Sequence, residues 1–232
     1  MNTPLTRTSL AQAGITIADA EGLGALTMRR VAGALGVATM SPYRHVTDRD
    51  DLLVAMVELI IRDRRPPVGD SVTWDAALRD VAFSDWDAFA QHPWLIEVWS
   101  TPRLRVDMGS FDQLERLLER LERAGVPRPH SLSVVLGVRG LTLGMASMAI
   151  ENRSGDRAAE PELADHWAQL VTRFGAQFPD SHPRSTWFMT HLHENGGSAA
   201  FVEALDGFLG GVAARHGLRI APEQTVEGSD AP

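Results

Sequence analysis

The sequence predicts an all-α protein that consists of a small N-terminal head and a larger helical body. Apolar residues recur at intervals of three and four along most of the chain, few segments alternate with a period of two, and Pro and Gly separate the periodic segments. The segment Arg65-Pro66-Pro67-Val68-Gly69 interrupts this pattern. We therefore expect a head at residues 1–65, a body at 70–217 and a loose polar tail at 218–232.

The first two helices of the head are marked by the same start and stop signals. Thr6 is expected to cap a helix that runs to about Glu21 and ends at Gly22. Thr27 is expected to cap a second helix of about eight residues that ends at Gly36. Each helix has apolar residues on both sides of its cap, as a hydrophobic staple requires.

Two further helices are expected in the head. Thr39 can cap a third short helix that runs through His45 or Val46, and Asp48 can cap a longer fourth helix with a continuous apolar stripe. Pro42 would occupy the third position of the short helix, where the backbone N–H has no partner within the helix. The short helix is therefore compatible with this proline.

The body is expected to contain seven helices, separated mostly by Pro and Gly. We place them near residues 74–91, 94–101, 107–124, 129–152, 162–178, 185–193 and 198–216.

Two short helices joined by a tight glycine-containing turn are what a helix-turn-helix requires, with one helix across the DNA backbone and the next in the major groove. The residues Leu26-Thr27-Met28-Arg29-Arg30-Val31-Ala32, Leu35-Gly36-Val37, Tyr43-Arg44-His45-Val46, Asp48 and Asp51-Leu52-Leu53 carry a more specific pattern. In this order and spacing they resemble the TetR family of bacterial repressors. The resemblance covers roughly residues 5–60, and it departs from the family at Pro42, where an aliphatic residue is usual.

The resemblance implies a role for each matching residue of a DNA-binding head. Contacts to phosphates would position the head, and they are implied for Thr27, Tyr43 and Arg49. Contacts to base edges would read the sequence, and they are implied for Arg29, Thr39, Met40, Ser41 and Arg44. His45 would reach either bases or backbone. A bundle of three short amphipathic helices that does not bind DNA is the structural alternative.

Charge and composition restrict the other classes of function. The net charge is −8, but residues 1–65 hold eight Arg against seven acidic residues, whereas the remainder holds fourteen against twenty-three. Only the head is electrostatically suited to phosphate. The absence of cysteine excludes thiolate catalysis and thiolate metal sites, and it agrees with a cytoplasmic location. We expect no signal peptide, no membrane-spanning helix and no membrane partner.

A helix-turn-helix protein commonly gains specificity as a two-fold dimer on palindromic half-sites. We expect a homodimer interface on residues 198–216, where an apolar stripe at helical spacing is formed by Phe201, Leu205, Phe208 and Val212. Residues Leu132, Val135, Leu143 and 145–150 offer a second surface. The resemblance implies a four-helix bundle between subunits, and the alternative is that both segments are intramolecular core.

Large apolar side chains of the body are candidates for a small-molecule effector site, which the resemblance also implies. These residues are Trp86, Phe89, Trp94, Trp99, Phe111, Met145, Met148, Trp167, Phe174 and Trp187. Arg139 lies on an otherwise apolar helix, where it could meet an anionic ligand or remain on the surface. We expect no metal, because His191 and His193 diverge by about 200° on a helix, and we expect no cofactor.

The sequence therefore predicts a ligand-responsive DNA-binding transcriptional regulator. The expected mode is a repressor that a small apolar effector releases from a palindromic operator. Two other classes stay open: an enzyme with an all-helical apolar pocket and a helical adaptor that binds only protein. The sequence shows no nucleophile elbow, phosphate loop, paired zinc histidines or Rossmann glycine pattern, which disfavours the enzyme.

Overall fold

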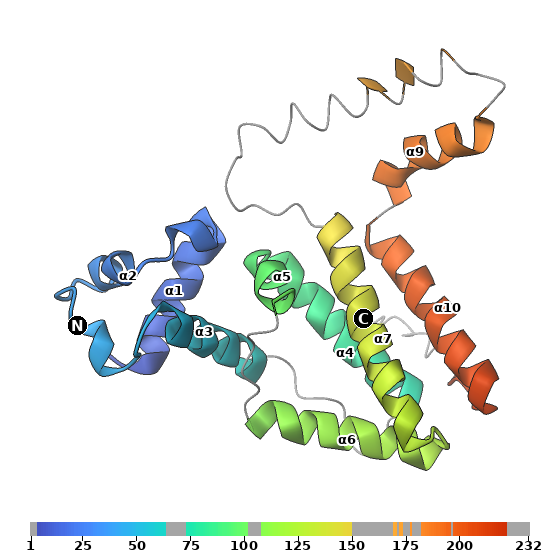
Figure 1. Cartoon of the computed structure of the whole chain (residues 1–232), viewed down its shortest axis with the longest axis horizontal. Helices are drawn as coiled ribbons and strands as arrows, with labels where there is room; N and C mark the ends of the chain where they lie inside the picture. The colour runs from blue at the N-terminus through green and yellow to red at the C-terminus, as the bar shows by residue number, and fades with distance from the viewer. Residues whose placement is uncertain are drawn as a thin grey trace, which may run out of the picture.

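The computed structural model describes residues 4–63, 73–101, 108–149, 182–195 and 197–221, together with residues 169, 170, 172, 173 and 177. All regular structure in these residues is helical, with the head at one end of the molecule and the body at the other (Figure 1). The head contains α1 (Arg7–Glu21), η1 (Leu23–Ala25), α2 (Met28–Ala34), η2 (Pro42–Arg44) and α3 (Arg49–Asp63), where η denotes a 3-10 helix. The body contains α4 (Trp74–Gln91), α5 (Trp94–Trp99), α6 (Met108–Ala124), α7 (Arg128–Ala149), α9 (Pro183–Asn195) and α10 (Ser198–His216).

The predicted all-α fold is confirmed, and most predicted helices lie within a few residues of the observed bounds. The helix expected near 162–178 falls mostly outside the described residues.

Side-chain caps fix the starts of the head helices, as predicted. The Thr6 hydroxyl accepts a hydrogen bond from the Ser9 backbone N–H at 3.0 Å, and Ser9 Oγ accepts one from the Thr6 N–H at 2.9 Å. This reciprocal pair satisfies two backbone donors that have no partner inside α1. Thr27 Oγ1 accepts from the Arg30 N–H in the same way, and Asp48 Oδ1 accepts from the Asp51 N–H.

The third helix of the head is shorter than predicted. Thr39 lies in a turn and caps no helix, and residues Pro42–Arg44 form a single 3-10 turn. Pro42 has no N–H to continue a helical ladder from the preceding residues. The N–H groups of His45 and Val46 both donate to the Pro42 carbonyl, at 2.9 and 3.1 Å, so the ladder ends after one turn.

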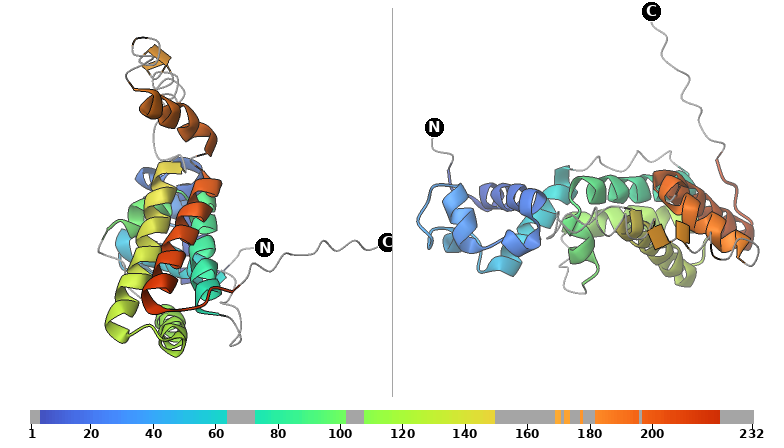
Figure 2. Two further views of the ribbon diagram at one scale, coloured as in Figure 1. Left: turned by 90° about the vertical axis from the view of Figure 1, so that its right-hand side faces the viewer. Right: turned by 90° about the horizontal axis from the view of Figure 1, so that it is seen from above.

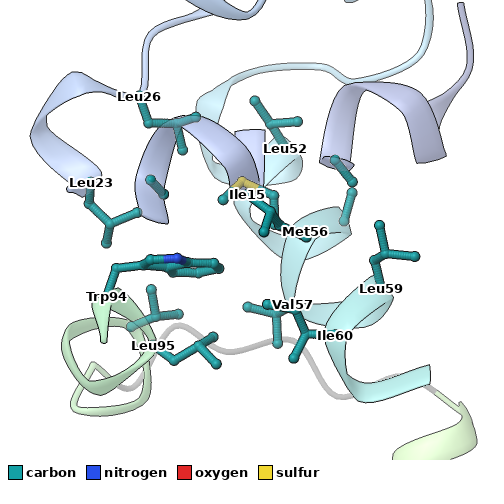
Figure 3. Packing of buried hydrophobic residues seen from close by; sticks show 14 of the residues in the cluster. Ile15, Leu23, Leu26, Leu52, Met56, Val57, Leu59, Ile60, Trp94 and Leu95 are labelled. Atoms are coloured by element: carbon teal, nitrogen blue, oxygen red, sulfur yellow. The ribbon is translucent and has the colours of Figure 1, made fainter. Parts of the chain in front are cut away.

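The core of the head extends into the body. Figure 3 shows Leu23 of the head next to Trp94 of α5, with Ile15, Leu26 and Val57 of the head in the same cluster. The cluster continues through further residues of α3, α4 and α5 and reaches Ala146 of α7. The predicted boundary near residue 65 is therefore a break in the chain pattern, while the hydrophobic core crosses it.

A partly buried polar contact lies beside this shared core. The Trp94 Nε1–H donates to Asp19 Oδ1 at 2.7 Å, and His92 Nδ1 lies 2.8 Å from the same oxygen. One carboxylate oxygen of α1 thus joins the head to the junction between α4 and α5.

The second core lies within the body, where α4, α6, α7 and α10 pack together. Helices α7 and α10 lie side by side along this body (Figure 2). Leu205 and Leu209 of α10 are buried among Leu78, Leu121 and Val138 of the other three helices.

The predicted dimer stripe lies on the inner face of α10. Phe201, Leu205 and Val212 are buried in the core of the same chain, and Phe208 is half-buried against it. If Gly137 of α7 carried a Cβ atom, that atom would lie 2.3 Å from Phe208 Cζ. The two helices therefore approach each other closely at this glycine. These four side chains therefore have the intramolecular packing that the sequence left open as the alternative.

By length and hydropathy α7 would suffice to cross a membrane, and it is the one such helix among the described residues. Its inner residues Val134, Val138 and Ala146 are buried in the cores. A core helix of a globular protein has the same composition, so the property does not by itself indicate a membrane.

The first residues of the predicted loose tail are held against the start of α4. The Trp74 Nε1–H donates to the Arg219 carbonyl at 3.0 Å, and the Ala221 N–H donates to Asp75 Oδ2 at 3.2 Å. The described part of the tail is therefore anchored.

Candidate functional site

The segment between α2 and α3 lies at the end of the head that is farthest from the body (Figure 1). Pro42 and Val46 are buried and anchor this segment to the head. Tyr43, Arg44 and His45, which lie between them, are exposed to solvent. The 3-10 turn thus presents one aromatic and two basic side chains together on the surface.

Three further predicted residues precede this turn. Thr39 and Met40 are exposed and Ser41 is half-buried. A chain of backbone hydrogen bonds holds this segment, with the Ser41 N–H donating to the Ala38 carbonyl at 2.8 Å and the Arg44 N–H donating to the Ser41 carbonyl at 3.3 Å. The outward side chains therefore project from an ordered backbone.

Helix α2 contributes two more candidates. The Thr27 hydroxyl oxygen accepts the cap hydrogen bond from Arg30, which leaves its O–H proton available for a phosphate oxygen. Arg29 is exposed, and none of the carboxylates in the described part of the chain forms an ion pair with it. Arg30 instead pairs with Glu21 of α1. The two neighbouring arginines thus differ, since Arg30 is paired with a carboxylate of the head and the exposed Arg29 guanidinium is not.

Arg49 has a structural role that the sequence did not reveal. Its Nε and Nη2 donate to the carbonyls of Leu26 and Leu23, both at 2.9 Å. These bonds join the start of α3 to η1 and use two of the five N–H donors of the guanidinium. The phosphate contact of Arg49 stays a prediction that depends on the remaining donors.

Asp51 braces the segment that leads into α3. Its carboxylate accepts hydrogen bonds from the Thr47 backbone N–H at 2.8 Å and from Arg7 Nη1 at 2.7 Å. The Thr47 N–H, and next to it the charge and hydrogen bond of Arg7, lower the pKa of Asp51 although partial burial opposes this. The ionised carboxylate thus fixes the end of the exposed segment to α1.

The predicted effector residues do not form one cluster. Phe89 and Trp94 are buried in the core shared with the head, and Trp86 stacks on Phe201 with ring centroids 4.3 Å apart. The exposed members of the set are Phe111, Met148 and Trp187, and Met145 is half-buried. Trp167 and Phe174 lie outside the residues whose side chains the structure describes.

The structure does bring three of the predicted residues together at the end of α5. The Phe89 and Trp99 rings meet edge to face with centroids 5.3 Å apart, and Arg139 Cζ lies 5.5 Å from the Trp99 ring centroid. A guanidinium over an aromatic face is stabilised by the ring quadrupole. Phe89 is buried in the shared core, so the half-buried Trp99 ring and the exposed Arg139 guanidinium are the accessible members of this group.

No group of three or more potential metal-ligating side chains occurs in the ranges that the structure describes.

The outer faces of α7 and α10 carry apolar and small residues. On α7, Leu132, Leu136 and Met148 are exposed, as are Gly140 and Gly144 between them. On α10, the exposed positions include Gly207, Gly211 and Ala214. The large side chains of α10 that were predicted to form the dimer interface thus face inward, whereas several of its small residues face outward.

Comparison with known proteins agrees with this architecture. Residues 66–216 match the family described as "Tetracyclin repressor-like, C-terminal domain". The HTH-type transcriptional repressor DrrR1 of Streptomyces coeruleorubidus is 33% identical over 169 residues, which make up 72% of this chain and 62% of that protein. The class D tetracycline repressor protein of Escherichia coli is 26% identical over 211 residues, or 89% of this chain and 88% of the relative.

Solved structures share the fold. The ActR protein of Streptomyces coelicolor, a TetR family protein crystallised with actinorhodin, aligns over 93% of this chain and 98% of its own with a TM-score of 0.71 and 22% identity. TetR from Acinetobacter baumannii AYE aligns over 92% of this chain and 99% of its own with a TM-score of 0.62 and 18% identity. Because the family match covers more than half of the sequence and the same fold extends over the head, the chain belongs to the TetR family.

Proposed function

We propose that this protein is a DNA-binding transcriptional regulator, a repressor that a small-molecule effector releases from its operator. The observation that carries the proposal is the exposed run Tyr43-Arg44-His45 between the buried anchors Pro42 and Val46. The names of the relatives support it, since DrrR1 and the class D protein are both called repressors. The complex of ActR with actinorhodin supports a ligand-binding body.

The exposed side chains of the head are proposed to make two kinds of contact, one to base edges and one to phosphates. Arg44 is suited to a guanine, whose O6 and N7 accept two hydrogen bonds from one guanidinium. Tyr43 and Thr27 offer hydroxyl groups to phosphates, and these contacts would fix the register of the head without reading sequence. Arg29 at the start of α2 is proposed, like Arg44, to face base edges.

The operator is proposed to be palindromic and the protein a homodimer. Exposed Leu132, Leu136 and Met148 give α7 an apolar outer face, and Gly207 and Gly211 would let a partner helix approach α10 closely. Two copies of this pair of helices would form an isologous four-helix interface. Such an interface would hold two heads at a fixed spacing along the duplex.

The effector is proposed to bind near Phe89, Trp99 and Arg139. The half-buried Trp99 ring, which packs on Phe89, suits an apolar, planar ligand, and Arg139 suits an anionic or strongly polarised group on it. Because coupling between two ligands is reciprocal, operator DNA must weaken effector binding by the factor by which effector weakens DNA binding.

Binding to duplexes selected from a random pool tests the proposal. We expect Arg44→Ala to weaken binding of the selected site by about 1–3 kcal/mol and to relax base preference at one position of each half-site. Arg123→Ala, which removes an exposed arginine of α6, is the matched control and should leave binding unchanged. Equal binding by both variants would contradict the placement of Arg44.

The same measurement separates the other classes of function. A helical adaptor would not be retained on duplex DNA at low salt, whereas a DNA-binding head should lose affinity steeply as salt rises. An enzyme would convert a bound small molecule. Sedimentation tests the dimer: Leu136→Glu should yield monomers, and Leu114→Glu on the exposed face of α6 should not.

A further inference from the structure

Met40 is placed unusually for an apolar side chain of the head. Its exposed fraction is 72%, whereas Leu10, Leu26, Leu52 and Met56 of the same unit are almost completely buried. Among residues 4–63, the exposed large hydrophobic side chains are Met40 and Tyr43. Tyr43 has a hydroxyl group that hydrogen-bonds in water, but the Met40 side chain offers only methylenes, a thioether and a methyl group. Its exposed apolar tip is therefore free to make an external apolar contact.

The neighbours of Met40 define the chemistry of that contact. Thr39 and Ser41 bring hydroxyl groups on either side, and Arg44 lies exposed one turn later. An apolar side chain in a segment that also carries hydroxyl and guanidinium groups is a poor match for a protein surface of mainly apolar character. It matches the major-groove edge of an A·T pair, where the C5-methyl group of thymine lies next to the acceptor O4 and near anionic phosphates.

We infer that Met40 determines specificity by packing against the C5-methyl group of a thymine in each half-site. This inference rests on the proposed function and names one base that the head would read. Methionine suits the role because it is unbranched and polarisable, so it can adapt to a methyl group whose position varies with the tilt of the head. Thr39 and Arg44 would hold the flanking bases by hydrogen bonds.

The test removes the thymine methyl group from the DNA and, separately, the Met40 side chain from the protein. Each thymine of the selected duplex is replaced in turn by deoxyuridine, which differs only by that methyl group. For the wild-type chain, one thymine in each half-site should be sensitive to this change. Each single replacement there should raise the Kd by about fourfold, the value expected for losing one buried methyl-sized group. Fluorescence anisotropy at one fixed salt concentration measures the change.

Three variants test whether Met40 is the source of the thymine preference. Met40→Ala should bind the thymine and deoxyuridine duplexes equally, whereas Met40→Leu, which keeps an apolar tip, should retain most of the discrimination. Leu114→Ala removes an exposed apolar side chain from α6 and should retain the full fourfold difference. Since Met40 is exposed, its replacement leaves the packing of the head unchanged.

The outcomes separate this inference from the proposed function. Failure to bind any duplex overturns both. Specific binding that is insensitive to every deoxyuridine, or a selected site without thymine, overturns the role of Met40 and leaves the proposed function standing. An unchanged thymine preference in Met40→Ala does the same, because another residue would then contact the methyl group.

Discussion

Removing the carboxylate of Asp19 should weaken the contact between the head and the body and lower the stability of the protein. The Trp94 indole ring is 1% exposed and its Nε1–H donates to Asp19 Oδ1 at 2.7 Å. Asp19→Ala leaves this buried donor without that acceptor, and a stranded buried group costs about 1–3 kcal/mol. The side chain of His92 is 19% exposed, so water can replace part of its contact with Asp19. Losing this contact therefore adds less to the destabilisation. We therefore expect Asp19→Ala to lower the free energy of unfolding by about 2 kcal/mol.

A double-mutant cycle assigns this loss to the hydrogen bond. Trp94→Phe keeps most of the buried ring but removes the donor, so Asp19→Ala should cost much less in that background than in the wild type. We expect a coupling of about 1 kcal/mol or more, measured by urea unfolding followed by circular dichroism. Costs that add within about 0.5 kcal/mol would refute the reasoning, because two groups without an interaction behave that way.

Three further predictions follow from local geometry. Gly137→Ala should destabilise the chain by about 1–3 kcal/mol in thermal unfolding, because its Cβ would overlap the Phe208 ring, and Phe208→Leu should recover part of the loss. The pKa of Asp51 is lowered from 3.8, so its contribution to stability is present above that pH and is lost as the pH falls through the lower folded-state value. Asp51→Asn should flatten this part of the curve of unfolding free energy against pH, and an unchanged curve would contradict the assignment. Thr27→Ala should cost about 1 kcal/mol of stability through the lost cap of α2, whereas Thr27→Ser, which keeps the acceptor, should cost little.

The sequence predicts the helices of the head where a local signal exists. The caps at Thr6, Thr27 and Asp48 are short-range hydrogen bonds between a side chain and a nearby backbone N–H, so the sequence contains both partners. The segment after Gly36 is different. The length of a helix in this segment depends on whether backbone hydrogen bonds continue past Pro42, and the structure shows only one 3-10 turn there.

The faces of α10 could not be assigned from the sequence. Helix α10 has large apolar residues on one face and glycine and alanine on others, so helical periodicity identifies an apolar stripe but not the element that covers it. The large residues Phe201 and Leu205 fill the core of their own chain, while the small residues Gly207 and Gly211 face outward. Long-range contacts decide between these faces, and the same holds for the hydrogen bonds of Arg49 and Asp19.

The core shared by α1, α3 and α5 sets a limit on how this protein can be re-engineered. A hybrid regulator that keeps residues 1–65 and takes its body from another protein would leave Leu23, Ile15 and Val57 facing a foreign surface in place of Trp94 and its neighbours. Such a graft would need to carry α5 and the His92–Trp94 segment with it to remain folded. The transferable unit of this protein is therefore larger than its DNA-contacting end, and a chimaera joined after α5 should express better than one joined before α4.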